Sequence, residues 1–426
     1  MTGPRALRVR GFVLAGIGIL CACTPGDDAA TSGLASVGSG VQRADSLVES
    51  WVREGQIPGA VLLVSKNGNI LHEKAYGWSR VEDFGAGQYP DAPPPEVTEV
   101  ATPTAMMAET VFDLASVTKV MATTMAIMLL VDQGLVEVDA PVVDYLPDFR
   151  GGGRETITVR HLLTHTSGLF QWQPTYYHAT DRDEAYAYIR DLPLRWPVGE
   201  GRHYSDLGFM LLGRIVEEQS GERLDAYVGG ALFEPMGLLN TGFIASTRRG
   251  ESHFASTSHG NPFERRMVHD PDFGYAIEGD PDRWDNWRQY TLSGEVNDGN
   301  AHHAFQGVAG HAGLFSTARE LSTLLQMLID GGKHDGQRLV EKATVDQFLT
   351  QEVDGQALGW QLPDYAPAET FAHTGFTGTF VAALPHSDLT VVLLTNRQNF
   401  GVDESTNYTD VGPLQRAVIE AVTTHH

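Results

Sequence analysis

The sequence predicts a mixed α/β (α+β) protein, with one antiparallel sheet built from N- and C-terminal segments, flanking helices and an inserted, mainly helical region. Two observations carry this prediction. Short apolar runs typical of strands gather at the two ends of the chain, whereas helical patterns and loops dominate from about residue 135 to residue 310. Because apolar faces must be buried against one another, the simplest packing brings both ends into a single sheet.

The N-terminal strands are predicted by a hairpin pattern. Residues 60–64 and 70–76 are apolar runs on either side of the Asn-Gly pair at 67–68, which favours a two-residue turn. A helical pattern over residues 41–52 precedes them. Residues 80–108 hold five prolines and show little periodicity, so we expect a long loop there.

The most apolar helix is predicted from Ala115 to Gln133. Its apolar residues occur on nearly every side, which is typical of a helix buried in a core. Gly134 follows at the position where a left-handed residue ends many helices. The C-terminal elements predicted by the pattern are a helix, two strands and a last helix, at residues 320–329, 377–384, 389–395 and 413–422.

Composition narrows the class of protein. Hydrophobic residues make up 42% of the 426 residues and charged residues 20%, as in ordinary soluble globular proteins. The formal net charge of −24 repels phosphate backbones, so nucleic acid is not an expected partner. We treat residues 42–425 as one domain that contains the helical insertion of residues 135–310. The oligomeric state is unknown at this stage.

The N-terminus has the features of an export signal. Arginines within the first ten residues precede an apolar run at 11–20, which is too short to span a bilayer as a stable helix. The sequence at 20–23, Leu-Cys-Ala-Cys, resembles a bacterial lipobox, in which a small residue precedes the lipid-bearing cysteine. The alternative is an ordinary signal peptide with incidental cysteines.

This pattern predicts a lipoprotein-type signal peptide at residues 1–22 and lipid attachment at Cys23. Residues 23–41 are rich in Gly, Ser, Ala and Asp, so we expect them to form a flexible tether. The protein is then expected to be an exported periplasmic or cell-surface lipoprotein, held at a membrane by its lipid anchor.

Ser116 and Lys119 form a Ser-x-x-Lys motif at the start of the predicted buried helix. Residues three positions apart share a helix face, so the amine can reach the hydroxyl. A serine needs a neighbouring base, and burial favours the neutral form of a lysine. We therefore expect Ser116 to be the nucleophile and a neutral Lys119 to accept its proton. The amide of Ser116, at a helix N-terminus, would face the developing oxyanion.

With two further motifs, the chain resembles the penicillin-recognising serine hydrolases, in the branch that contains class C β-lactamases, DD-peptidases and esterases. The resemblance extends over about residues 42–423, and stretches at 159–169 and 310–317 look like the scaffold of that family. The motifs that carry it are, in chain order, Ser116-Val-Thr-Lys119, Tyr204-Ser-Asp206 and His373-Thr374-Gly375, with Phe376 following.

The resemblance implies a role for each motif residue. Tyr204 would share proton transfer with the lysine of the first motif. Residues 373–375 would line the substrate site on a strand, and Phe376 would supply a second oxyanion amide beside that of Ser116. Asp206 replaces the more common asparagine, which contacts a substrate amide; an ionised aspartate can only accept hydrogen bonds.

Other histidines carry less information. His161 and His165 have the i, i+4 spacing of some zinc sites, but no glutamate follows His161, so we expect packing roles. His302, His303 and His311 are expected to make loop contacts. We therefore expect neither a metal nor another cofactor.

Together these observations predict a serine hydrolase that forms an acyl-enzyme on Ser116. Its substrate would be a small molecule or peptide with an amide or ester bond, such as a cell-wall D-amino-acid peptide or a small ester. A β-lactam is expected to be a poor substrate because of His373 and Asp206. Two alternatives stay open: a non-catalytic or slowly deacylating penicillin-binding sensor on the same fold, and a metal hydrolase that uses the histidines.

Overall fold

The computed structural model describes residues 26–85, 97–243, 253–273 and 279–424, together with positions 275 and 277, and gives side chains from residue 38 onward. The predicted signal peptide and the predicted lipidation site, Cys23, lie outside the described residues.

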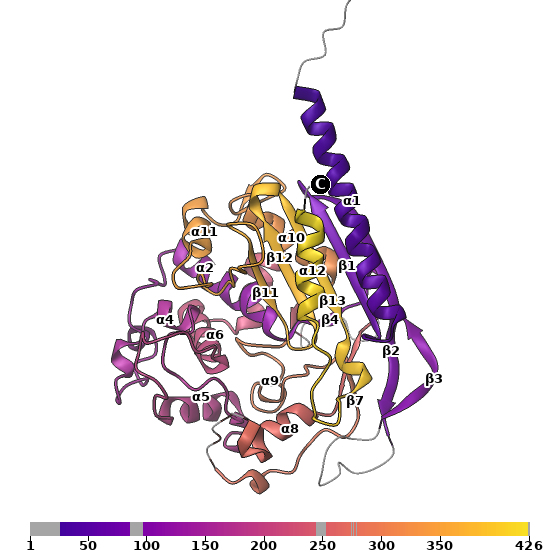
Figure 1. The fold of residues 1–426 in the computed structure, drawn as a ribbon. Coiled ribbons are helices and arrows are strands. Elements are labelled where there is room, and N and C mark those ends of the chain that lie inside the picture. The colour runs from indigo at the N-terminus through magenta and orange to yellow at the C-terminus, as the bar shows by residue number, and fades with distance from the viewer. Residues whose placement is uncertain are drawn as a thin grey trace, which may run out of the picture.

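Strands from both ends of the chain meet in one six-stranded antiparallel sheet, in the order β11-β12-β13-β1-β2-β3 (Figure 1). The hairpin predicted at residues 67–68 joins β1 to β2, and β1 also pairs with β13. The predicted fold class is thus confirmed. The strands of the sheet are β1 (Gly59–Lys66), β2 (Asn69–Phe84), β3 (Val97–Ala105), β11 (Phe371–Thr374), β12 (Thr379–Leu384) and β13 (Leu389–Thr395).

Side chains that alternate along β1 fill two layers. Leu62 and Val64 pack in the layer with α1 (Gly26–Arg53) and α12 (Gly412–Thr423), which lie side by side on one face of the sheet (Figure 1). Their neighbours Val61 and Leu63 pack in the larger core, with α10 (Ala318–Ile329) and the helical region.

The chain between β4 and β11 is mainly helical and lies beside the sheet, with α4, α5 and α6 farthest from β3 (Figure 1). Two small sheets, β4-β8-β5 and β6-β7, brace it. The remaining helices are α2 (Met125–Asp132), α3 (Val142–Tyr145), α4 (Val159–Leu163), α5 (Arg182–Asp191), α6 (Asp206–Ser220), α7 (Leu224–Val228), α8 (Pro262–His269), α9 (Gly299–His303) and α11 (Lys342–Leu349). The remaining strands are β4 (Phe112–Asp113), β5 (Gly242–Phe243), β6 (Ser256–His259), β7 (Thr291–Ser293), β8 (Leu314–Ser316), β9 (Lys333–His334) and β10 (Gln337–Arg338).

Two sequence-based expectations about irregular segments need correction. Residues 80–108 are not one loop, because β2 continues to Phe84 and pairs with β3 at the edge of the sheet. An edge strand leaves one row of amides unpaired, so Pro103 is tolerated in β3. Residues 26–41, expected as a tether, are helical. Nucleation is the costly step of helix formation, so the packed segment at 41–52 lets the helix propagate towards the N-terminus.

The helix that carries the proposed nucleophile changes its geometry along its length. It starts as a 3₁₀ turn, η1 (Ala115–Val117), continues as a π-helical turn, η2 (Lys119–Thr124), and ends as α2. It is long and apolar enough to cross a membrane, but 83% of it is buried inside the fold, so we interpret it as a core helix. Gly134 follows with a φ of 71°, as the sequence predicted.

Candidate active site

The first motif places an amine against a serine hydroxyl. Lys119 Nζ donates a 2.8 Å hydrogen bond to Ser116 Oγ and a 3.1 Å hydrogen bond to the main-chain carbonyl of His311. The lysine side chain is fully buried. The spacing of the motif thus brings the two groups together, and the hydrogen bond to the carbonyl of His311 fixes the position of the lysine Nζ.

Lys119 is nevertheless a cation at rest, which corrects the expectation of a neutral lysine. Burial lowers the pKa of Lys119, but the carboxylate of Asp206, 2.7 Å from Nζ, together with Tyr204, outweighs burial and raises the pKa above its ordinary value. An opposite charge at this distance favours the charged form. An ammonium cannot itself accept the serine proton, so the site needs a further acceptor.

Tyr204 completes the group around the nucleophile. Burial raises the pKa of its hydroxyl, and the neighbouring Lys119 and Ser116 lower it only partly. The tyrosine is therefore a neutral phenol at rest. Its ring packs against His165 with the ring centres 4.3 Å apart, and His165 Nδ1 accepts the amide of Ser205 over 3.0 Å.

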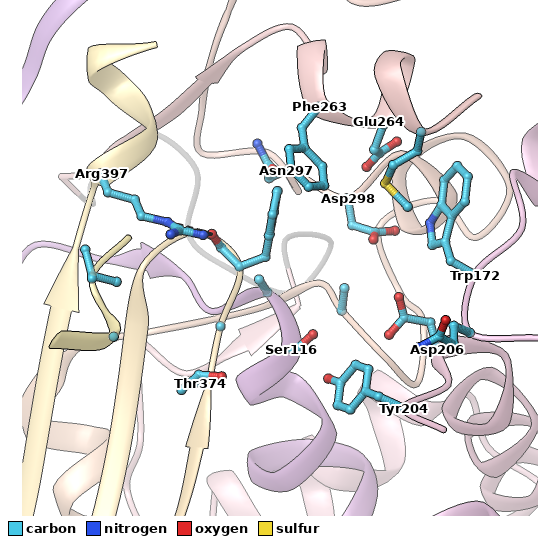
Figure 2. A pocket seen from close by; sticks show the side chains of 18 of the residues that line it. Ser116, Trp172, Tyr204, Asp206, Phe263, Glu264, Asn297, Asp298, Thr374 and Arg397 are labelled. Carbon is cyan, nitrogen blue, oxygen red and sulfur yellow. Dashed lines mark hydrogen bonds between the residues drawn. The ribbon is translucent and has the colours of Figure 1, made fainter. Parts of the chain in front are cut away.

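These side chains open into a cavity of about 570 Å³. Figure 2 shows Ser116 at its base, with Asp206 and Trp172 on one side and strand β11, which carries Thr374, on the other. Glu264 closes the cavity from α8, and its pKa is raised to about 8 by burial and by a neighbouring carboxylate. The side of the cavity near Asp206 is thus rich in carboxyl groups.

The third motif lies on β11, but only part of it reaches the cavity. Thr374 and Gly375 line the cavity, and so does Phe376. His373 does not line it: alternation along the strand turns this side chain towards Tyr204, with the ring centres 6.2 Å apart. Burial lowers the pKa of His373 to about 3, so the imidazole is neutral.

The main chain is arranged for a pair of oxyanion donors. Ser116 and Phe376 line the same cavity, and the amide of Phe376 donates no hydrogen bond within the described part of the chain. Ala115 precedes the nucleophile with a φ of 45°, in the left-handed region. Asp113 holds this conformation, because its carboxylate accepts the amide of Ala115 over 2.8 Å and that of Asn297 over 2.6 Å.

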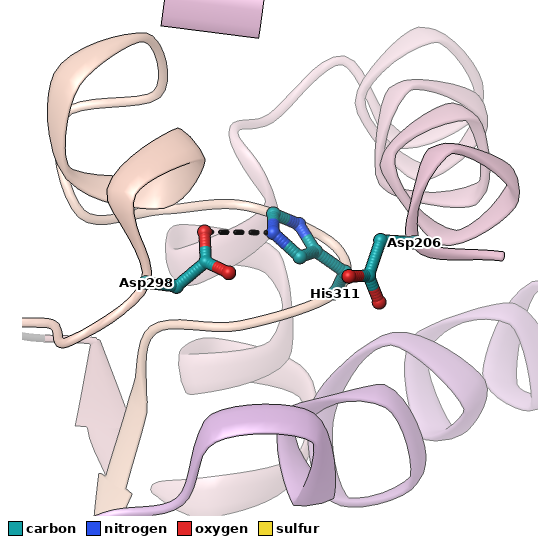
Figure 3. Close-up of side chains that lie close together, drawn as sticks. All are labelled: Asp206, Asp298 and His311. Atoms are coloured by element: carbon teal, nitrogen blue, oxygen red, sulfur yellow. Dashed lines mark hydrogen bonds and ion pairs between the residues drawn. The ribbon is translucent and has the colours of Figure 1, made fainter. Parts of the chain in front are cut away.

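Asp206, Asp298 and His311 each place one oxygen or nitrogen within 4.8 Å of the others (Figure 3). His311 Nε2 lies 2.9 Å from Asp298 Oδ1. A divalent cation at this point would lie close to the ammonium of Lys119, which already pairs with Asp206, and like charges at such distances repel strongly. We therefore interpret the two carboxylates as counter-charges of the lysine.

The other histidines considered from the sequence lie in structural positions. His161 Nδ1 accepts the amide of Thr158 over 3.1 Å and so caps α4. His302 and His303 end α9, and His303 packs against Trp284 with the ring centres 4.9 Å apart.

Comparison with known proteins identifies the family. Residues 44–413 match the family described as Beta-lactamase. The chain belongs to this family. This confirms the resemblance inferred from the three motifs. Together with relatives named as an amidase and a carboxypeptidase, it makes the chain a serine hydrolase of the Beta-lactamase family.

Individual relatives match most of the chain. An N-acetylmuramyl-L-alanine amidase of Bacillus subtilis (strain 168) is 33% identical over 387 residues, which cover 84% of this chain and 81% of that protein. A protein of Escherichia coli (strain K12), provisionally named a D-alanyl-D-alanine carboxypeptidase, is 29% identical over 84% of this chain and 83% of its own length. A class C beta lactamase from Rhodobacter sphaeroides shares the fold, with a TM-score of 0.62 at 21% identity, over 90% of this chain and 99% of its own.

Several residues of the site escaped sequence reasoning. Glu264 and Asp298 come from the irregular part of the helical region, and Asp113 precedes the first motif without belonging to it. None of the three belongs to a recognisable motif, and isolated carboxylates are common in any chain. His311 was interpreted as a loop contact, whereas its carbonyl holds Lys119.

Proposed function

We propose that this protein is an amidase of cell-wall peptide fragments that works through an acyl-enzyme on Ser116. The observation that carries the proposal is the 2.8 Å contact of a fully buried Lys119 with Ser116 Oγ at the base of a cavity. Groups that can transfer a proton, Lys119 and Tyr204, surround the hydroxyl of Ser116, and a serine becomes a nucleophile when such groups take up its proton. The two amides at Ser116 and Phe376 would stabilise the tetrahedral intermediate.

The choice of an amide is supported by the relatives. The names of the Bacillus subtilis and Escherichia coli proteins both describe cleavage at an alanyl residue, by an amidase and by a carboxypeptidase. Of the two, the amidase is the more similar, and its name places N-acetylmuramyl on the acyl side of the bond. We propose a muramyl-type acyl group joined to a peptide amine as the first substrate to test.

The shape of the site supports an extended substrate. A second cavity of about 840 Å³ continues from the first past Thr374, which lines both. Arg202 and Arg416 line this second cavity, and neither forms an ion pair with any residue that the structure describes. The guanidinium of Arg416 lies over the ring of Tyr365, and three aspartates line the same cavity, at positions 354, 364 and 410. Guanidinium groups bind carboxylates well, and the peptide leaving group of a cell-wall fragment carries carboxylates, so the two arginines are the groups in this cavity that we propose to bind it. A short ester would fill only the first cavity.

The test is turnover of three amide and ester substrates by the wild type and by Ser116→Ala. We expect the N-acetylmuramyl-L-alanyl peptide to be cleaved faster than a D-alanyl-D-alanine peptide, and a 4-nitrophenyl ester to report acylation. The alanine variant should lose all three activities and labelling by a fluorophosphonate, while it stays folded. Labelling of the variant at the wild-type rate would disprove the nucleophile.

The same assays separate the alternatives. A slowly deacylating sensor would release one equivalent of product in a burst and then stop, whereas an enzyme continues to turn over. A metal hydrolase would lose activity with a chelator. If the protein cleaves only the ester, it is an esterase, and the proposed amide substrate is refuted.

A further inference from the structure

We propose that Asp206 is the final proton acceptor during acylation, so that Ser116, Lys119 and Asp206 form a proton relay. The proposal rests on the proposed role of Ser116 as nucleophile, and it gives Asp206 a catalytic role in addition to the substrate contact that the family resemblance implies.

The geometry of the relay is continuous. Ser116 Oγ lies 2.8 Å from Lys119 Nζ, and Nζ lies 2.7 Å from Asp206 Oδ1. This carboxylate oxygen is buried and forms an ion pair with the lysine, and no described residue donates to it in ordinary hydrogen-bond geometry. The transfer therefore requires Nζ to turn one of its N–H bonds towards Asp206 Oδ1. The carbonyl of His311 holds Nζ between the two ends.

The position of Asp206 in the fold favours an ionised acceptor. Asp206 is the first residue of α6, and Ser205 caps this helix by accepting the amide of Gly208. The partial positive charge of a helix N-terminus stabilises a carboxylate. At rest the relay therefore holds an ammonium and a carboxylate in contact, and no neutral lysine is required.

Acylation moves two protons along the relay. The proton of Ser116 Oγ moves to Lys119 Nζ while another proton of Nζ moves to Asp206 Oδ1. The lysine keeps three protons and its positive charge, and Asp206 becomes a carboxylic acid. The electron pair of Oγ forms the bond to the substrate carbonyl carbon, whose π pair moves to the carbonyl oxygen.

Collapse of the tetrahedral intermediate reverses the proton path. The oxyanion pair re-forms the carbonyl, and the bond from carbon to the amine nitrogen breaks. Asp206 returns its proton to Lys119, and a proton of Nζ passes to the leaving amine, either directly or through the hydroxyl of Tyr204, which contacts both Lys119 and Ser116. Asp206 is then a carboxylate again, and the acyl-enzyme remains on Ser116.

Several other titratable side chains surround the relay. His165 and His373 are buried, and burial lowers the pKa of both, so they are neutral. Burial raises the pKa of Asp298, but its contact with His311, the amide of Ala301 and the charge of Lys119 together lower it below its ordinary value. Lys119 interacts electrostatically with Asp206, Tyr204, Asp298, His165 and His373. Asp206 faces Lys119, Tyr204 and Tyr275, and it lies within 4.8 Å of Asp298 and His311.

Two mechanisms predict opposite effects of Asp206→Asn on the pH dependence of acylation. If Lys119 had to be neutral, loss of the carboxylate would lower the pKa of the lysine and move the acid limb of the profile to lower pH. In the relay, the carboxylate is the base. Its loss leaves only deprotonated lysine as an acceptor, so the acid limb moves to higher pH.

The experiment measures the second-order rate of fluorophosphonate labelling from about pH 5 to about pH 10, with the labelled peptide mapped by mass spectrometry. We expect the acid limb of Asp206→Asn to lie at least about one pH unit above that of the wild type, which is about tenfold slower labelling at a fixed pH on that limb. An unchanged limb, or one at lower pH, overturns the relay.

Two further variants keep the result decisive. Asp206→Glu retains a carboxylate, so its acid limb should match that of the wild type at a lower absolute rate; a limb like that of Asp206→Asn refutes the need for the carboxylate. Asp298→Asn removes a negative charge from the same cavity but leaves the ion pair between Asp206 and Nζ in place. If its acid limb shifts as far as that of Asp206→Asn, the shift reflects the loss of any nearby negative charge and not the loss of the proton acceptor. Labelling at a residue other than Ser116 would refute the proposed nucleophile and not the relay alone. If the enzyme does not cleave cell-wall amides, the proposed substrate is wrong, but the pH profiles of labelling still test the relay.

Discussion

The hydroxyl of Thr377 donates a 2.7 Å hydrogen bond to the main-chain carbonyl of Asp113. Two residues later, the hydroxyl of Thr379 donates to the carbonyl of Leu114 over 3.0 Å. Both threonines are buried. The two bonds tie the turn after β11 to the segment that leads into the nucleophile, and these are the two pieces of chain that carry the proposed oxyanion amides.

The first prediction concerns this connection. Thr377→Val keeps the shape of the side chain but removes the donor, so the spacing of the two amides is no longer fixed. We expect kcat for the ester to fall about tenfold with KM little changed, because the amides act on the transition state. Thr390→Val is the control: this equally buried threonine of β13 bonds to Ser65 on β1 and to Ser322 on α10, away from the cavity. An equal loss of kcat in the control would refute a positioning role.

The second prediction tests whether Asp113 acts through Ala115. Asn in place of Asp113 can no longer accept from two amides, so we expect Asp113→Asn to lower kcat. Ala115→Gly should restore part of that loss, because glycine adopts a positive φ without the cost that alanine pays. The measurements are kcat and the thermal midpoint of the two single variants and the double variant. A double variant that is no faster than Asp113→Asn would contradict the coupling.

The sequence predicted the sheet well because its signals are local. The Asn-Gly turn, the apolar runs and the buried helix are each readable over about ten residues, and β1, β2, β12 and β13 occur where those signals lie. The sequence pattern does not predict the edge strand β3. This strand pairs with a neighbour, β2, on one side only, and it carries polar residues and a proline. Its pairing with β2 is a tertiary property that local periodicity does not report.

The sequence predicts which residues form the site, but it does not predict the protonation state of Lys119. Ser116, Lys119 and Tyr204 belong to short motifs, and the structure brings them together. The protonation of Lys119 depends instead on where Asp206 lies, 87 positions away in sequence and 2.7 Å away in space. Burial and ion pairing act in opposite directions on a lysine, and only distance shows which one wins.

The third prediction is a pH dependence of stability. Burial, together with Asp298, raises the pKa of Glu264 to about 8. An acid whose pKa is higher in the folded state contributes stability at low pH, and this contribution is lost as the pH rises from the unfolded value through about 8, by up to about 1.4 kcal/mol per pH unit. Glu264→Gln keeps the shape and cannot ionise. Its thermal midpoint, measured across that range, should fall less steeply than that of the wild type; parallel curves would count against the assignment.

The fourth prediction concerns Cys23, which lies outside the described residues. The lipobox-like sequence that ends in Cys23 implies a lipid anchor. Expressed in a bacterial host, the wild type should partition into the detergent phase and Cys23→Ala into the aqueous phase. If both forms stay in the aqueous phase, the protein is exported without an anchor.

The fifth prediction is that this protein is a poor β-lactamase, and it rests on two positions. The family resemblance implies that efficient β-lactamases carry a lysine where this chain has His373. The pKa of His373 is lowered to about 3 by burial, and its side chain does not line the cavity, so it offers no positive charge to the carboxylate of a β-lactam; the longer side chain of a lysine would have to reach the cavity from this position. Asp206 adds a carboxylate to the wall of the cavity, where it repels the same group.

Each lost charge-assisted contact costs roughly 1.5–3 kcal/mol, or about 10–150-fold in rate if it acts in the transition state. We therefore expect the ratio of kcat/KM for a chromogenic cephalosporin to that for a short nitrophenyl ester to be low in the wild type. The ratio should rise in the His373→Lys, Asp206→Asn double variant, with each protein measured at its own pH optimum. Using the ratio cancels the slower acylation that loss of Asp206 brings to both substrates. A wild type that already hydrolyses the cephalosporin at about 10⁶ M⁻¹s⁻¹, mid-range for good enzymes, would show that these two side chains do not exclude anionic lactams.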